Sequence, residues 1–263
     1  MTVRSLLLRG MLAGLLAGML ALAFAEVFGE PQVDRAITFE QQEARLNHEA
    51  LGPQLVSRDV QKSAGLAVAV ALYATAFGGL FALAFAVAYG RIGRFGPRAC
   101  AALLAGGGFV AIVLAPFLKY PANPPAIGNP ATIDRRTALY FLVLGCSLLA
   151  AIGAVVLGRR LLPRAGAWNA AVLAAAAFVV TIAIVQLALP TVDEVPPGFP
   201  ASALWRFRLA SLGTQLVLWT AMGLLFGALT ERSLRRSLRA GSASRPGVRA
   251  SPAAPSRTQP AGD

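Results

Sequence analysis

The sequence has few of the side chains that usually carry catalysis or bind metals. Its 263 residues contain one histidine and two cysteines, and the only lysines are Lys62 and Lys119. Neither lysine ends a G-x-x-x-x-G-K-[ST] stretch, which excludes a P-loop, and one histidine cannot form an H-E-x-x-H zinc site. No serine lies in a nucleophile elbow. We therefore expect that the chain is not an enzyme and that it holds no permanently bound cofactor.

Charged residues are also scarce, at 14% of the chain against 56% hydrophobic residues, more apolar than a soluble domain of this size requires. They leave six uncharged runs, at residues 10–25, 63–90, 99–118, 137–158, 165–192 and 209–230. Five runs have at least 20 residues, enough for a helix to cross about 30 Å of hydrocarbon. The first reaches that length if residues 5–8 are counted and Arg9 extends toward the headgroups. Because period-2 alternation is missing, we expect an all-α, polytopic integral membrane protein with six transmembrane helices.

The first run allows two interpretations. Two arginines, an apolar segment and the stretch "AFA" at 23–25 are the parts of a cleaved signal peptide. Alternatively, Gly10, Gly14 and Gly18 recur every four residues, the spacing by which membrane helices pack closely together. We favour a retained helix, because a cleaved segment needs no packing face.

The basic residues orient the runs in the membrane. Placing the N-terminus, the linkers 91–98 and 159–164 and the C-terminal tail on one side collects 15 basic residues there and nine on the other. The positive-inside rule then puts both termini in the cytoplasm and predicts three outward-facing hairpins, with outer loops 26–62, 119–136 and 190–208. Ten of the twelve acidic residues fall on the outer side. The net charge of +12 thus follows from topology and indicates no nucleic-acid partner.

The chain divides into two parts. Residues 1–232 are predicted to form a six-span domain surrounded by membrane lipid. Residues 233–263, rich in Arg, Ser, Pro and Ala, cannot form a core and are predicted to be a disordered, basic cytoplasmic tail. Cys100 and Cys146 fall at different depths of the membrane, so we expect no disulfide between them.

The second and third outer loops share a proline-rich pattern, "YPANPPAIGNP" and "PTVDEVPPGFP". Each pattern precedes two arginines and a charge-free helix; the arginines are Arg135 and Arg136, or Arg206 and Arg208. Proline fixes φ and cannot donate a backbone hydrogen bond, so it ends the preceding helix and stiffens the loop. We expect this stiffness to hold Lys119 and Asn123 over the outer mouth of the bundle.

Long stretches of these loops carry a resemblance to a known family. They read "PFLKYPANPPAIGNPATIDRRTALY", "LPTVDEVPPGFPASALWRFRLASLGTQLVLW" and "GEPQVDRAI", followed by "LVSRDVQKSAGL" and "FGGLFALAFA". These stretches resemble the cobalt transporter subunit CbtA family over nearly all of residues 1–232. The resemblance implies an inner-membrane subunit of a cobalt uptake system, working with a small partner subunit that has one membrane span and a His-rich end.

Carboxylates and an imidazole are the side chains that could bind cobalt(II) on the outer side. The candidates are the adjacent pair Asp193 and Glu194, Glu26 at the end of the first helix, and His48. They could form an acidic vestibule that concentrates cations, or they could simply keep the outer loops solvated. His48 lies within a predicted outer helix, "TFEQQEARLNHEA", whose geometry puts neither Glu40 nor Glu43 on its stripe, so a site there needs ligands from another loop or from the partner.

Two glutamines are the candidates within the predicted membrane helices. Gln186 and Gln215 fall in the outer third of the fifth and sixth helices. They could hold helices together by hydrogen bonds, or line a pocket where a partly hydrated cation pauses. No acid, base or histidine lies in the middle of a helix, which excludes the usual proton relay of a pump.

The sequence thus predicts a membrane subunit for transition-metal uptake, with cobalt(II) as its substrate. It would supply the translocation pathway or an outer vestibule together with the small partner subunit, in a homo- or hetero-oligomer. One alternative is a structural or assembly protein that scaffolds a neighbouring transporter. Another is a membrane enzyme acting on lipid-linked substrates.

Overall fold

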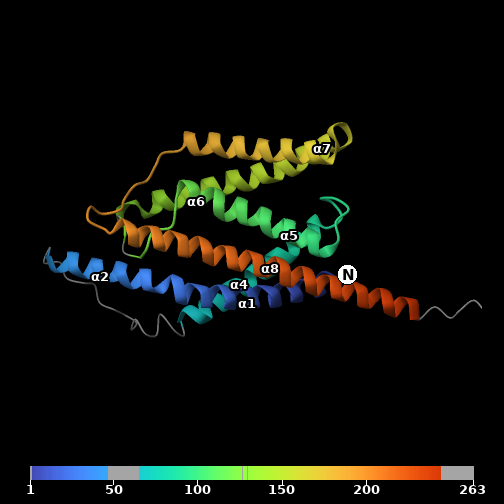
Figure 1. Ribbon diagram of the computed structural model, residues 1–263, viewed down its shortest axis with the longest axis horizontal. Coiled ribbons are helices and arrows are strands. Elements are labelled where there is room, and N and C mark those ends of the chain that lie inside the picture. Colours follow the sequence, from blue (N-terminus) through green and yellow to red (C-terminus); the bar gives the residue numbers. More distant parts are fainter. Residues whose placement is uncertain (1, 47–64, 126, 129, 244–263) are drawn as a thin grey trace, which may run out of the picture.

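The computed structural model describes residues 2–46, 65–125, 127–128 and 130–243, and within these ranges the chain is helical and contains no strand (Figure 1). The all-α prediction is therefore confirmed. The elements in chain order are α1 (Val3–Phe28), α2 (Glu30–Leu46), α4 (Leu66–Ala88), α5 (Pro97–Gly108), the π-helix η2 (Phe109–Leu114), α6 (Ala115–Lys119), the 3-10 helix η3 (Pro130–Thr132), α7 (Ile133–Ala188) and α8 (Ala201–Ala243).

Among the described residues, five helical segments are long and apolar enough to cross a membrane: α1, α4, the continuous segment Pro97–Lys119, α7 and α8. The 56 residues of α7 would extend about 84 Å as one straight helix, far more than a bilayer core. The helix is instead broken at Gly166, whose φ of 74° is accessible to glycine at little cost. Its two halves run side by side in opposite directions (Figure 1). The protein is thus a multi-pass membrane protein.

Small residues bring α1 and α4 into direct backbone contact. A methyl group on Gly14 would overlap the carbonyl oxygen of Ala74, and one on Gly78 would overlap the carbonyl oxygen of Gly10. Gly18 lies equally close to Ala74. This confirms the packing face predicted from the four-residue spacing of glycines, because any larger side chain would force the two backbones apart.

Aromatic side chains fill the centre of the bundle between α4 and α8. Phe226 packs edge-to-face against Phe81 and Phe85, with ring centroids 5.4 and 4.9 Å apart. Trp219 packs in the same way on Phe77, at 5.0 Å, and is only 4% exposed. Together with small residues of α1 and α5, these rings form the main apolar core.

One end of the bundle is built from α2 and the proline-rich loops. Only Gly29 separates α1 from α2, so the helix predicted within the first outer loop begins earlier, at Glu30, and nearly continues α1. Its Phe39 packs on Phe199 with centroids 5.1 Å apart, in a small core that includes Ile127. His48 lies outside the described residues.

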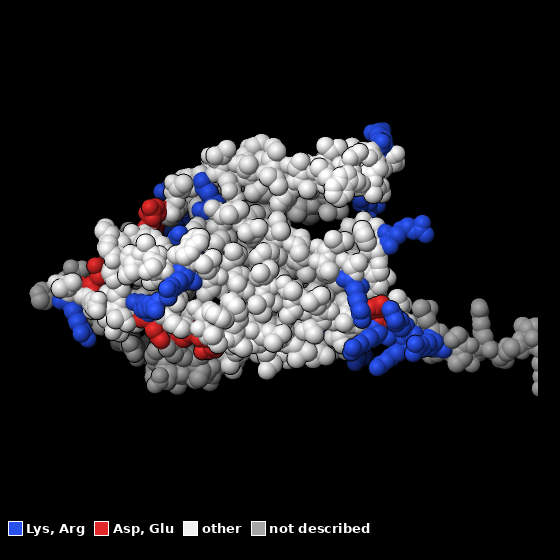
Figure 2. All heavy atoms as spheres, in the orientation of Figure 1, with Lys and Arg blue, Asp and Glu red and all other residues white. Residues whose placement is uncertain are grey.

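Basic side chains gather at the opposite end with little negative charge among them, whereas most red, acidic patches lie toward the end formed by α2 and the loops (Figure 2). Here α8 continues to Ala243, so the predicted tail begins with helix rather than with disorder at Ser233. An ion pair between Glu231 and Arg235, four residues apart, stabilises this extension, and Ser237 donates to the carbonyl of Ser233.

Candidate functional site

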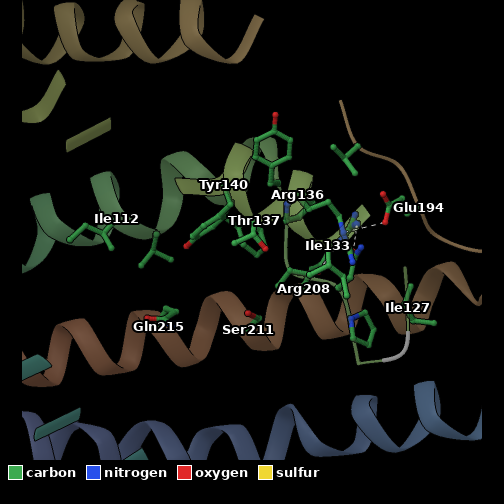
Figure 3. A pocket seen from close by; sticks show the side chains of 18 of the residues that line it. Ile112, Ile127, Ile133, Arg136, Thr137, Tyr140, Glu194, Arg208, Ser211 and Gln215 are labelled. Atoms are coloured by element: carbon green, nitrogen blue, oxygen red, sulfur yellow. Dashed lines mark hydrogen bonds and ion pairs between the residues drawn. The ribbon is translucent and has the colours of Figure 1, made fainter. Parts of the chain in front are cut away.

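A cavity of about 600 Å³ lies beneath the proline-rich loops, and we call it the outer cavity because those loops are predicted to lie on the outer side. Its walls come from α4, η2, α6 and the loop after it, the first two turns of α7, the loop between α7 and α8, and α8. Arg136, Thr137 and Tyr140 project from α7, while Arg208, Ser211 and Gln215 lie on the facing side of α8 (Figure 3). The spacing of three or four residues within each set is that of one helix face, so one stripe of each helix lines the cavity.

Arg136 and Glu194 form an ion pair at the rim of the outer cavity. Arg136 lies at the beginning of α7, directly after η3, and Glu194 lies in the loop that connects α7 to α8. Nε of Arg136 is 3.2 Å from Oε2 of Glu194, with side-chain exposures of 30% and 14%. Thr132 donates its hydroxyl to Oε1 of the same carboxylate. Glu194 of the third outer loop is therefore held by Arg136 and Thr132, which follow the proline-rich stretch of the second outer loop.

Arg208 makes the reciprocal connection from the start of α8. Its Nη2 donates to Oδ1 of Asn123 at 2.9 Å, and its Nε donates to the carbonyl of Ala122 at 3.4 Å. Each arginine therefore binds the loop of the other hairpin. Charge-assisted hydrogen bonds of this kind are stronger than neutral ones, so the two loops hold each other in place.

Tyr120 adds a third link between the loops. Its hydroxyl donates to the carbonyl of Pro190 at 2.8 Å. Burial raises the pKa of the Tyr120 phenol, and the positive charge of Arg135 opposes this effect. The net result is a phenol that keeps its proton, and thus its role as donor, at neutral pH.

The predicted outer-mouth residues fall in two different places. Asn123 lines the outer cavity and binds Arg208, as its position in the stiff loop suggested. Lys119, the last residue of α6, is half-buried and does not line the cavity. Their role in a pathway remains a prediction.

The two glutamines also separate. Gln215 lines the outer cavity, whereas Nε2 of Gln186 donates to the carbonyl of Ala115 at 2.9 Å and joins α7 to α6. Gln186 thus makes the helix-to-helix hydrogen bond that was one of its two interpretations. Only Gln215 is placed to meet a molecule in the cavity.

The carboxylates predicted as metal ligands do not come together in the described part of the chain. Asp193 and Glu26 are exposed, Glu194 is paired with Arg136, and His48 is not described. Among described residues, no group of three His, Cys, Asp or Glu side chains is arranged to hold a metal ion. A metal-binding role for Asp193, Glu194, Glu26 and His48 stays a prediction.

Trp219 forms the floor of the outer cavity. Its indole also lines a second cavity of about 160 Å³, on the side of α5, and its ring fills the space over Gly108. Phe77 packs against the same indole and lines the outer cavity as well. Trp219 therefore separates the two cavities.

Arg136 and Arg208 are the site residues that sequence reasoning missed. The two basic pairs were visible in the sequence, but no role was assigned to them. Helical geometry offered a signal, because residues two apart on a helix point about 200° apart, so Arg206 and Arg208 cannot both face the cavity. The structure agrees, since Arg135 and Arg206 are exposed and line no part of the outer cavity.

Comparison with known proteins gives one finding. The model of the family described as "Probable cobalt transporter subunit (CbtA)" matches residues 3–231, nearly the whole chain. No curated protein and no solved structure matches this chain. The chain therefore belongs to the CbtA family of probable cobalt transporter subunits.

Proposed function

We propose that this protein is the membrane subunit of a cobalt uptake system and that the outer cavity is its vestibule. The observation that carries this proposal is the reach of the cavity. It runs from the loops at Arg208 to Trp219, eleven residues further along α8, which corresponds to about 16 Å along a helix. A polar opening of this depth, closed by an aromatic floor, suits a substrate that is taken from outside and then passed inward.

A vestibule that receives substrate from outside requires the proline-rich loops to lie on the outer side of the membrane. We propose six spans in three outward-facing hairpins. The protein would lie in the inner membrane, with both termini in the cytoplasm. The break of α7 at Gly166 supports six spans, because it divides the longest helix into two. The concentration of arginines at the end opposite the loops supports the orientation (Figure 2).

A partner subunit would complete the metal chemistry. The chain has one histidine, and imidazole is a preferred ligand of cobalt(II). We propose that a small single-span subunit with a His-rich end supplies the missing ligands near the vestibule. Cobalt(II) is then a substrate that passes through, and not a resident cofactor.

Uptake of radiolabelled cobalt tests the proposal. Cells that lack this protein and its partner should recover uptake at limiting cobalt when both are restored, and should recover little with either alone. A scaffold for a neighbouring transporter would instead require that transporter for any recovery, and an enzyme on lipid-linked substrates would leave cobalt uptake unchanged. Competition by excess nickel shows whether the system distinguishes the two metals.

A further inference from the structure

We propose that the outer cavity is an oxyanion site, in which Arg136 and Arg208 bind a carboxylate or phosphate group of a small ligand. For the proposed transport function, this means that cobalt enters as a complex with an organic acid and not as a bare hydrated cation. The entry of cobalt as a complex rests on the proposed function, whereas the oxyanion site does not.

The charge of the cavity lining supports an anionic ligand. Two guanidinium groups and one carboxylate line the outer cavity, so its net charge is +1. The carboxylate is already paired with Arg136 and accepts from Thr132. Asp193 does not line the cavity; its charge acts on Arg208 from outside, but Asp193 is exposed, so solvent and salt screen it. A bare divalent cation would therefore meet net repulsion here, whereas an anion would be attracted.

The two arginines are also placed where one oxyanion could meet both of them. Their side chains reach into the same part of the outer cavity from α7 and α8, with Glu194 beside them (Figure 3). Arg208 uses its Nε and Nη2 on Ala122 and Asn123, which leaves Nη1 for a ligand. Nε of Arg136 is buried and makes no hydrogen bond within the described residues, because its ion pair with Glu194 lacks hydrogen-bond geometry. A guanidinium presents paired donors that match a carboxylate or phosphate, so a ligand could take up this unused N–H.

The rest of the lining fits a ligand of molecular size. The volume of about 600 Å³ falls within the range typical of pockets for small organic molecules, and it is much larger than one metal ion requires. Ser211, Thr137 and Gln215 add hydroxyl and amide donors along the walls, and each of these can donate to further oxygens of an organic acid.

Titration calorimetry on the purified full-length protein in maltoside detergent tests the site. The probes are citrate, the one-to-one complex of cobalt(II) with citrate, cobalt(II) chloride and inorganic phosphate. We expect citrate and its cobalt complex to bind, and cobalt(II) chloride to show no binding that depends on Arg136 or Arg208. Binding of phosphate with the same arginine dependence also supports an oxyanion site.

Matched variants locate the binding. Arg208→Gln and Arg136→Gln should each weaken citrate binding at least tenfold, whereas Arg206→Gln and Arg135→Gln, at the exposed neighbours, should leave it unchanged. Glu194→Gln should tighten binding several-fold, because it removes the carboxylate that competes for Arg136. A gain of affinity cannot result from misfolding, so this variant keeps the proposal testable if an arginine variant is unstable.

Three results would overturn the proposal. The first is equal loss of affinity in the exposed and the cavity-lining arginine variants. The second is tight binding of cobalt(II) chloride alone that Glu194→Gln weakens. The third is loss of citrate binding when the protein is moved into phosphatidylglycerol vesicles, which would assign the arginines to a lipid phosphate. Since binding is measured without transport, failure here leaves cobalt-dependent uptake standing, and failure of uptake leaves the oxyanion site standing.

Discussion

The two ends of the helix bundle, outer and inner in the proposed topology, are closed in different ways. At the outer end, long loops are joined by side-chain bonds around a cavity, and the carboxylate of Glu194 is largely buried. At the inner end, glycines let α8 pack directly on α5, and Glu231 pairs with Arg98 and Arg235, which are 62% and 70% exposed. The outer end thus depends on a few specific polar contacts, and the inner end on close packing. If the proposed topology holds, this difference corresponds to an outward-open form with its barrier between Trp219 and the inner surface.

The largest effect is expected from widening the inner end. A side chain on Gly223 would overlap Ala105 of α5, so Gly223→Leu should lower the free energy of unfolding by about 3 kcal/mol through overpacking. The change would appear as a lower midpoint of thermal unfolding in detergent. Gly153→Leu is the control, because Gly153 is exposed and has open space around it. Equal midpoints for the two variants would show that the inner end is not tightly packed.

An intermediate effect is expected at the outer ion pair. Glu194→Gln leaves Arg136 without its counter-ion in a partly buried position, and should cost about 2 kcal/mol. The same unfolding measurement applies. The control is Asp193→Asn, which removes a neighbouring carboxylate that is exposed. A cost no greater than that of Asp193→Asn would mean that the pair does not hold the loops together.

The smallest effect is expected at the inner ion pairs. Glu231→Gln removes the same type of charge as Glu194→Gln, and Glu231 is itself only 19% exposed. Its partners Arg98 and Arg235, however, are 62% and 70% exposed against 30% for Arg136, so solvent can hydrate them and the loss should be only about 0.5 kcal/mol. High salt should reduce this cost, since solvent ions screen the exposed charges of Arg98 and Arg235. If Glu231→Gln were as costly as Glu194→Gln, the contrast between the two ends would be wrong.

The sequence was sufficient to predict the features that depend on local chemistry. Uncharged runs predicted the helices, the glycine spacing predicted the close contact of α1 with α4, and the prolines predicted a stiff loop that carries Asn123. The reciprocal arginine bonds could not be predicted, because Arg208 and Asn123 are 85 positions apart and meet only when the two hairpins lie side by side. The pairing of Glu194 with Arg136 likewise depends on tertiary structure, so a carboxylate read from sequence as available for metal is already engaged.

The most direct test of the central claim, that the outer cavity is the route for substrate, is to block it chemically from outside. Ser211→Cys places a thiol inside the cavity, and Ala201→Cys places one on the exposed start of α8 as a control. We predict that an impermeant thiol reagent added to intact cells labels both variants, and that it abolishes cobalt uptake only in Ser211→Cys. Full uptake by a completely labelled Ser211→Cys protein would contradict the account.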